Sequence, residues 1–122
     1  MIHTYKDLTV WQKAIELSVE IYELTAQFPS EEKYGLSSQM RRAAVSIPSN
    51  IAEGRLRGSK KEYKQFLLIA FGSGGELETQ MEIAKRLKKT KDLNYAKVES
   101  LLVEIMKMLN KIISQIYIST CV

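Results

Sequence analysis

The sequence has little of several residue types on which common protein chemistries depend. A single cysteine, Cys121, rules out an internal disulfide bond and is typical of a reducing compartment. The longest stretches without a charged residue, 65–75 and 112–122, are shorter than the roughly 20 residues that span a bilayer. The first residues also lack the apolar segment of a signal peptide. We therefore expect a cytoplasmic protein that does not interact with a membrane.

Histidine is equally scarce, because His3 is the only one in the chain. Di-iron bundles need inward-facing Glu-x-x-His pairs, zinc sites draw on several histidines and cysteines, and serine or cysteine nucleophiles need a histidine base. Cys121 lies beside the terminus, where a cysteine is more often inert than nucleophilic. The sequence therefore predicts no metal, no cofactor and no catalytic residues, and we do not expect an enzyme.

Helical periodicity is what the chain has in abundance. Among its 122 residues, 45% are hydrophobic, and four segments repeat apolar residues at three- and four-residue steps. No segment shows the apolar–polar alternation of a strand bounded by hairpin turns. The pattern predicts one all-α domain over residues 1–122, folded as an antiparallel up-and-down four-helix bundle. The expected helices run from about 8 to 27, from about 37 to 54 or 58, from 59 to about 88, and from 92 or 94 to about 117.

Pro48 lies inside the second of these segments. A proline there removes its own amide, frees the carbonyl of Ala44 and costs roughly 3 kcal/mol. The helix either kinks at Pro48 or stops and restarts with Ser46 or Ser49 as a cap. We favour the kink because the apolar period continues in phase from 47 to 51.

Capping residues mark the helix ends between these segments. Ser37 or Ser38 is the expected cap at the start of the second helix. A glycine, either Gly54 or Gly58, is expected to end it, since glycine adopts the left-handed conformation freely. The sequence Ser59-Lys60-Lys61-Glu62 then predicts a capping box that begins the third helix.

The stretch Gly72-Ser73-Gly74-Gly75 lies within the expected third helix, where each glycine costs on the order of 1 kcal/mol relative to alanine. A phosphate-binding loop is excluded because the stretch has no Gly-Lys-Ser/Thr ending and no preceding strand. We expect instead that the small residues let another helix, or a large ring such as Trp11, approach closely. A helix break is the less favoured alternative, since the apolar period stays in phase on both sides.

Positive charge is concentrated in two blocks. Residues 41–64 hold seven basic and two acidic side chains, and residues 85–97 hold six basic side chains and one aspartate. A solvated helix end explains one such block more often than a ligand does. If both blocks lie on one surface or around one opening, an anionic partner becomes the better explanation. The expected phosphate contacts are Arg55, Arg57, Lys60, Lys61, Lys64, Lys88, Lys89 and Lys91.

Arg41 and Arg42 are expected to act differently from the other cations of the first block. Glutamates of the third helix can reach them across the bundle. We interpret such contacts as structural ion pairs rather than as acid–base chemistry. The predicted pairs join Arg41 or Arg42 to Glu76, Glu78 or Glu82.

Several short motifs occur in an order that is specific to a known family. They are Leu8-Thr9-Val10-Trp11-Gln12-Lys13-Ala14, Phe28-Pro29, Tyr34-Gly35-Leu36, Gln39-Met40-Arg41-Arg42-Ala43-Ala44, Ser46-Ile47-Pro48-Ser49-Asn50-Ile51-Ala52-Glu53-Gly54, Phe66-Leu67, and Gly72-Ser73 followed by Glu76-Leu77-Glu78-Thr79-Gln80. Over about residues 5–117 the chain resembles the small four helix bundle proteins encoded within intervening sequences of 23S ribosomal RNA genes, which are often described as ribosomal-like.

The resemblance implies an up-and-down four-helix bundle that assembles as a ring-like homopentamer and has no known catalytic residues. The chain is also similar to the accessory protein of diversity-generating retroelements, a basic pentamer that binds reverse transcriptase and nucleic acid. These expectations about assembly and partners rest on the family motifs.

Two functions remain open at this point. The basic blocks and the resemblance favour a non-catalytic homo-oligomer that binds RNA or DNA. The alternative is a scaffold for a protein partner, such as a reverse transcriptase, without direct nucleic-acid binding. Oligomerisation is also indicated by two apolar stripes on the first helix and a broad apolar surface on the fourth, which exceed what one slim bundle buries.

Overall fold

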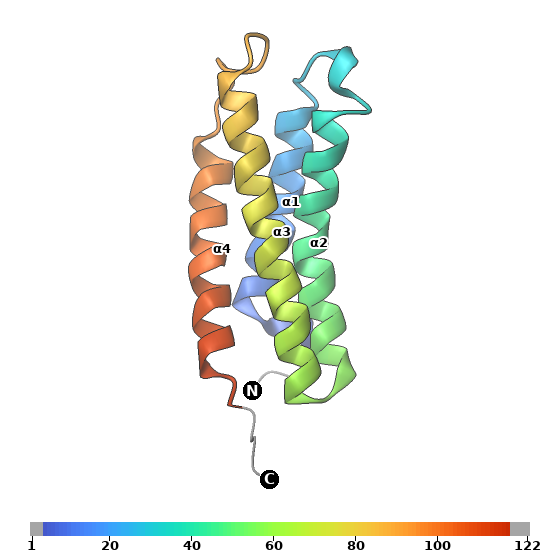
Figure 1. Cartoon of the computed structure of the whole chain (residues 1–122), viewed down its shortest axis with the longest axis vertical. Helices are drawn as coiled ribbons and strands as arrows, with labels where there is room; N and C mark the ends of the chain where they lie inside the picture. Colours follow the sequence, from blue (N-terminus) through green and yellow to red (C-terminus); the bar gives the residue numbers. More distant parts are fainter. Residues whose placement is uncertain (1–3, 118–122) are drawn as a thin grey trace.

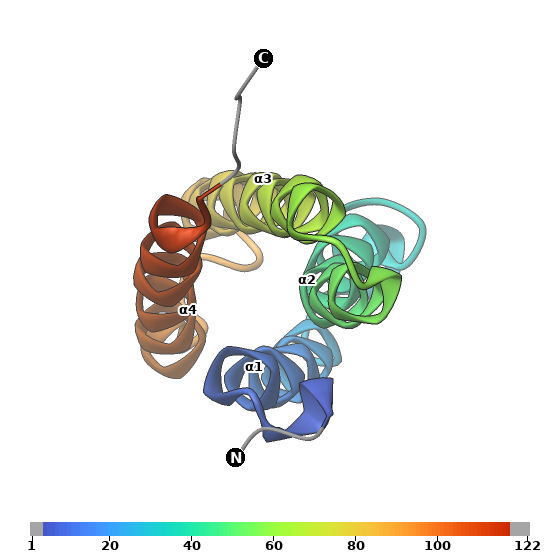
Figure 2. The ribbon, with the colours of Figure 1, turned by 90° about the horizontal axis from the view of Figure 1, so that it is seen from below.

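The computed structural model describes residues 4–117, and within this range it contains helices and no strands. Four long helices pack side by side, each antiparallel to the next (Figure 1). Viewed along the bundle axis they lie at the corners of a square, so that consecutive helices are neighbours and α4 returns to α1 (Figure 2). The predicted all-α four-helix architecture is confirmed. The elements are η1 (Tyr5–Asp7), α1 (Thr9–Thr25), η2 (Ser30–Glu32), α2 (Leu36–Arg57), α3 (Lys60–Arg86) and α4 (Ala96–Gln115).

One apolar seam on each long helix faces the centre of the bundle. On α1 the predicted seam is buried along its whole length, from Val10 to Phe28. On α4 burial ends sooner, because Leu109 is fully buried whereas Ile112 and Ile116 are only partly covered. Each fully buried large aliphatic side chain contributes about 1.5–3 kcal/mol. The largest fully buried apolar side chains are Leu17, Ile21, Met40, Ile47, Ile51, Leu67, Leu77, Leu102, Ile105 and Leu109.

The helix α2 passes through Pro48 without interruption. The alternative in which the helix stops and restarts at Ser46 or Ser49 is therefore wrong. The Ala44 carbonyl that the proline leaves free accepts a hydrogen bond from the Ser18 hydroxyl of α1, with an O···O distance of 3.1 Å. The same hydroxyl lies 3.0 Å from the Ala14 carbonyl, so its one proton is shared between two acceptors. A buried serine of α1 thus compensates for the proline of α2.

The start of α2 differs from the prediction. The helix begins at Leu36, so Ser37 is buried within the first turn and does not cap it. The Leu36 amide donates instead to the Glu32 carboxylate, with an N···O distance of 3.1 Å. A carboxylate in this place also interacts favourably with the positive end of the helix dipole. Glu32 therefore does what the sequence analysis expected of a serine.

The helix α3 also continues without a break through its glycine-rich stretch. At Gly74 the helix α4 comes close, since a Cβ there would lie 2.3 Å from the sulfur of Met106. A Cβ at Gly72 or Gly75 would meet no described atom within 4 Å. Trp11 packs against Tyr5 of η1, with ring centroids 5.4 Å apart. Among the three glycines, the predicted close approach is therefore made at Gly74, by Met106 rather than by Trp11. At Ser73 the helix α2 also comes close, since the Ser73 and Ser46 hydroxyls lie 2.8 Å apart.

Candidate nucleic-acid interface

The cations at the end of the first block and those of the second block lie at opposite ends of the bundle, whereas Arg41 and Arg42 lie near the start of α2. The first block includes the turn between α2 and α3, at the lower end in Figure 1, and the second surrounds the turn between α3 and α4, at the upper end. The 27 residues of α3 separate these turns by about 40 Å at 1.5 Å per residue. The arrangement in which both blocks share one surface is therefore not found. We distinguish the α2–α3 end cluster (Arg55, Arg57, Lys60, Lys61, Lys64) from the α3–α4 end cluster (Lys88, Lys89, Lys91).

The turn that carries the first cluster consists of two residues, Gly58 and Ser59. Gly58 ends α2 with a φ of 83°, a left-handed conformation that favours glycine. Ser59 caps α3, because its hydroxyl oxygen accepts from the Glu62 amide with an O···N distance of 3.1 Å. The Glu62 carboxylate in turn accepts from the Ser59 hydroxyl at 3.1 Å, rather than from the Ser59 amide. The predicted helix end and cap are both present, with this difference in the glutamate.

Close packing of α2 on α3 brings the charges of the two helices together. A Cβ at the buried Gly54 would lie 2.7 Å from Cβ of Phe66 and 3.2 Å from the ring of Tyr63. Only glycine permits this separation without a shift of one helix. The last turn of α2 and the first turns of α3 consequently present their basic residues at one end of the bundle.

Most cations of the α2–α3 end cluster lack a carboxylate partner among residues 4–117. Arg57 is the exception, because its guanidinium lies 3.1 Å from Glu53 and 3.6 Å from Glu62. Arg55 stacks over the ring of Tyr63, 5.6 Å from its centroid. Three lysine side chains form no ion pair or hydrogen bond with another described residue: those of Lys60, Lys61 and Lys64.

A hollow of about 230 Å³ opens beside this turn. Burial raises the pKa of Tyr63, and the neighbouring Arg55 cation acts against that rise. The phenol therefore stays neutral at physiological pH, while Arg55 and Lys60 make the rim positive. The hollow combines an aromatic ring, a serine hydroxyl and two cations, a set suited to phosphate oxygens. Its lining residues are Gly54, Arg55, Gly58, Ser59, Lys60 and Tyr63.

At the α3–α4 end of the bundle, carboxylates pair with most basic residues of the second block. Lys85 Nζ lies 2.7 Å from the Glu99 carboxylate, and Lys89 pairs with Glu31 of η2. Hydrogen bonds to these carboxylates raise the pKa of both lysines. Within the described chain, Lys88 and Lys91 alone in the second block have no partner. The ion pairs of the block are Lys85–Glu99, Arg86–Glu82, Lys89–Glu31 and Lys97–Glu20.

Arg41 pairs with α1 rather than with the glutamates of α3. Its Nε donates to the Thr25 hydroxyl at 2.7 Å, and its guanidinium carbon lies 4.6 Å from the centroid of the Tyr22 ring. Successive residues of a helix point about 100° apart, so Arg41 and Arg42 cannot both face α3. The seven ion pairs of the described residues include none of the four predicted members, Arg41, Arg42, Glu76 and Glu78.

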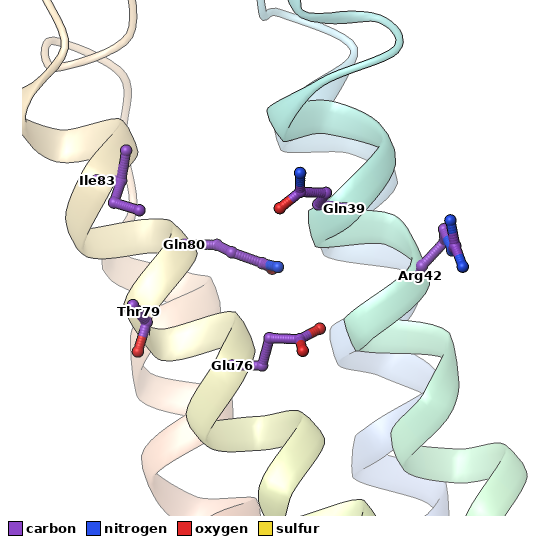
Figure 3. Close-up of a pocket in the computed structure, with 6 residues that line it drawn as sticks. All are labelled: Gln39, Arg42, Glu76, Thr79, Gln80 and Ile83. Atoms are coloured by element: carbon purple, nitrogen blue, oxygen red, sulfur yellow. The ribbon is translucent and has the colours of Figure 1, made fainter.

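Arg42 and Glu76 instead line one open pocket between α2 and α3 (Figure 3). Its volume is about 580 Å³, and the buried Gln80 places an unpartnered side-chain oxygen beside it. The side chains of Gln39 and Gln80 could not be singled out from the sequence, because a glutamine on a helix adds no charge and does not interrupt the apolar period. The one available signal was spacing, since Gln39 lies three residues before Arg42 and Gln80 lies four residues after Glu76. The lining residues are Gln39, Arg42, Glu76, Thr79, Gln80 and Ile83.

Within residues 4–117, no group of three or more His, Cys, Asp or Glu side chains is arranged to hold a metal ion. None of the described helices has an apolar stretch of the length needed to cross a bilayer. The two residues considered for metal or nucleophile chemistry, His3 and Cys121, lie outside the described residues.

Comparison with known proteins agrees with the motifs found in the sequence. Among solved structures, a protein of unknown function from the S23 ribosomal protein family of Bacteroides thetaiotaomicron VPI-5482 is similar, with 25% sequence identity and a TM-score of 0.73. The similarity covers 88% of this chain and 100% of that one. No curated protein matches the chain. Residues 6–111, which reach from η1 into α4, match the model of the 23S rRNA-intervening sequence protein family, and the chain belongs to this family.

Proposed function

We propose that this chain is a non-catalytic homo-oligomer that binds RNA or DNA through the α2–α3 end cluster. One observation carries the proposal: five cations surround a two-residue turn, and only Arg57 among them pairs with carboxylates of the described chain. Neighbouring unpaired cations repel each other, and phosphates relieve this repulsion while they release counterions. The family name, 23S rRNA-intervening sequence protein, is consistent with an RNA partner.

The geometry of the cluster favours contacts to the phosphate backbone over contacts to bases. Lys60 and Lys64 are four residues apart and therefore lie one helical turn apart on the same side of α3. Both lie in the first turns of the helix, where the helix dipole also attracts anions. Lysines of this kind position a protein on nucleic acid without selecting a sequence. The proposed binding is accordingly strong at low salt and largely independent of base composition.

Oligomerisation is the second element of the proposal, and the outer face of α1 is the proposed contact. Ile15, Val19 and Tyr22 recur at steps of four and three residues on this face and are 38%, 54% and 47% exposed. A hollow of about 290 Å³ beside them is lined in part by Trp11 and Val45. Packing these side chains against another copy removes apolar surface from water. A ring-like pentamer, as the resemblance implies, would present five copies of the α2–α3 end cluster and bind by multivalency.

Salt-titrated binding of the full chain to a structured RNA and to a DNA duplex tests the first element. We expect binding to both, with a logarithm of affinity that falls linearly with the logarithm of salt concentration. An absence of binding at low salt would overturn the proposal. Light scattering of the same samples tests the second element, and a monomer mass at micromolar concentration would refute it.

A scaffold for a protein partner, such as a reverse transcriptase, is the second candidate function. The observation that favours it is the outward face of α3, where Leu68 and Ile69 are 49% and 50% exposed and Gly72 adjoins open space. Such a face accepts a partner helix at short range. Co-purification of a protein after nuclease treatment, lost on Ile69→Glu while nucleic-acid binding is retained, would favour the scaffold. Loss of all partners on nuclease treatment would exclude it.

A further inference from the structure

The pocket between α2 and α3 is separate from the α2–α3 end cluster. Gln39 lies near the start of α2 and Ile83 near the end of α3, so the pocket is in the half of the bundle nearer the α3–α4 turn. Its volume of about 580 Å³ falls within the range of small-molecule sites, about 300–1,000 Å³. The proposed nucleic-acid contact uses no residue of this pocket. The pocket therefore needs an explanation of its own.

The two walls of the pocket carry polar side chains that have found no partner. Gln39 and Arg42 are three residues apart on α2, and Glu76 and Gln80 are four residues apart on α3, so each pair shares one helix face. Figure 3 shows Glu76 and Gln80 reaching from α3 toward α2, Gln39 reaching toward α3, and Arg42 at the outer side of α2. None of these four side chains makes a hydrogen bond or an ion pair with another described residue.

At Gln80, contact with solvent does not explain the lack of a hydrogen-bond partner. The residue is 6% exposed, and its Oε1 is the one buried side-chain polar atom of the described residues without a hydrogen-bond partner. The buried hydroxyl of Thr90, by contrast, donates to the Ala84 carbonyl at 2.6 Å. A buried acceptor without a donor is unfavourable and rare in folded proteins. An N–H donor from a bound molecule would satisfy it.

We propose that this pocket binds a free α-amino acid in its zwitterionic form, whose carboxylate pairs with Arg42 and whose ammonium donates to Glu76 and to Gln80 Oε1. The charges match one to one, because the pocket offers one unpaired cation and one unpaired anion from opposite walls. The flexible arginine side chain reaches the carboxylate from the rim, and a guanidinium binds a carboxylate with two parallel hydrogen bonds. The Gln39 amide can donate or accept. The amino-acid side chain would lie against Ile83, which is 47% exposed.

Other ligand classes fit these walls less well. A phosphate would meet the Glu76 carboxylate and be repelled by it. An apolar molecule would cover Gln80 and Glu76 without supplying a donor to either, which is unfavourable for both groups. A zwitterion is the small ligand that pairs the cation, the anion and the buried acceptor at the same time.

Calorimetric titration of the full chain with glycine, leucine, glutamate and lysine tests the proposal. We expect at least one to bind saturably below about 10 mM, a range that detects millimolar dissociation constants. The N-acetylated and the amidated forms of that amino acid, which each lack one charge, should bind at least tenfold more weakly. A nucleoside monophosphate should not compete. Failure of all four amino acids to bind, equal binding of the blocked forms, or competition by the nucleotide would each overturn the proposal.

Matched variants locate the site independently of nucleic-acid binding. Glu76→Gln and Arg42→Gln should each weaken amino-acid binding at least tenfold, and Glu78→Gln, on the same helix but outside the pocket, should leave it unchanged. Gln80→Leu should abolish binding while raising the melting temperature, because it removes an unpaired buried oxygen. Unchanged binding in these pocket variants would place the ligand elsewhere and refute the assignment. RNA affinity should stay the same in all four variants, so this proposal and the proposed function can fail separately.

Discussion

The two ends of the bundle carry similar numbers of cations and differ in how they use them. At the α3–α4 end, carboxylates from α3, α4, α1 and η2 reach four of the six basic residues of the block. At the α2–α3 end, carboxylates reach only Arg57 among the five cations of the cluster. The difference lies in which other segments share the end, because η2 brings Glu31 to the upper turn, where it pairs with Lys89 (Figure 1). Charge available for a partner therefore depends on neighbouring elements more than on local sequence.

The α3–α4 turn and the α2–α3 turn also differ in the contacts that hold them in place. The α3–α4 turn is tied by buried hydrogen bonds, since the Tyr95 hydroxyl donates to the Thr90 carbonyl at 2.7 Å and Thr90 in turn donates to α3. Burial also raises the pKa of Tyr95. The α2–α3 turn has two residues, one glycine in a left-handed conformation and one capping serine. The α3–α4 end pairs four of its six basic residues with carboxylates, whereas the α2–α3 end is held by backbone geometry and pairs only Arg57 among its five cations.

The largest expected effect comes from filling the space that lets α2 and α3 approach. Gly54→Val places branched carbons against Phe66 and Tyr63, and overpacking of this kind should lower the free energy of unfolding by about 2–3 kcal/mol. The matched control is Gly72→Val, whose side chain meets open space and should change stability by less than about 0.5 kcal/mol. Urea unfolding of both variants measures the difference. Equal losses would mean that the close crossing does not hold the α2–α3 end together.

A smaller loss of stability is expected when Gly58, the glycine of the α2–α3 turn, is replaced. Gly58→Ala forces a side chain into a left-handed conformation, which should cost about 1–2 kcal/mol. Lys88→Ala, an exposed substitution at the opposite turn, should stay within about 0.5 kcal/mol of the parent protein. Thermal unfolding of the two proteins side by side is sufficient. A neutral Gly58→Ala would show that the turn adopts another conformation.

The smallest effect concerns the ion pairs of the α3–α4 end and depends on pH. A lysine whose pKa is raised in the folded state stabilises the protein below its unfolded pKa, about 10.5 for Lys85, and this contribution is lost as pH rises through the folded value. We expect a slight fall in melting temperature across this alkaline range. Glu99→Gln removes the negative charge that pairs with Lys85 and should abolish that part of the fall. The same alkaline fall in Glu99→Gln as in the parent protein would contradict the pairing.

Much of the fold follows from the sequence because helical periodicity reports which face of a segment is buried. The seam of α1 from Val10 to Phe28 and the continuity of α2 through Pro48 were predictable for this reason. The compensation of Pro48 by Ser18 was not, since it depends on the register between two helices far apart in the chain. Similarly, the exposure of Gly72 and Gly75 reflects the rotation of α3 relative to its neighbours, which the spacing of small residues leaves undetermined.

The sequence names the cations of the candidate site but does not show which of them lie together on one surface. Up-and-down topology places successive turns at alternating ends, so the separation of the two clusters follows once four antiparallel helices are accepted. The pairing of Lys89 with Glu31, 58 residues earlier, requires tertiary structure. For the same reason the sequence predicts an ion pair between Arg41 and glutamates of α3, whereas Arg41 contacts Thr25 and Tyr22 of α1. Long-range neighbours decide which charges stay free, and local sequence does not record them.

The most direct test of this account compares two charge-matched variants in one binding experiment, Lys60→Gln/Lys61→Gln/Lys64→Gln and Lys85→Gln/Lys89→Gln/Lys97→Gln, the second of which removes lysines that pair with carboxylates. Affinity of each for the same RNA is measured over a series of salt concentrations. The account predicts that the first variant binds at least tenfold more weakly at low salt and that its log affinity–log salt slope is shallower by about 2–3, since each lost phosphate contact removes about 0.7–0.9. It predicts a much smaller change for the second variant. Equal losses in both variants, or a larger loss in the second, would contradict it.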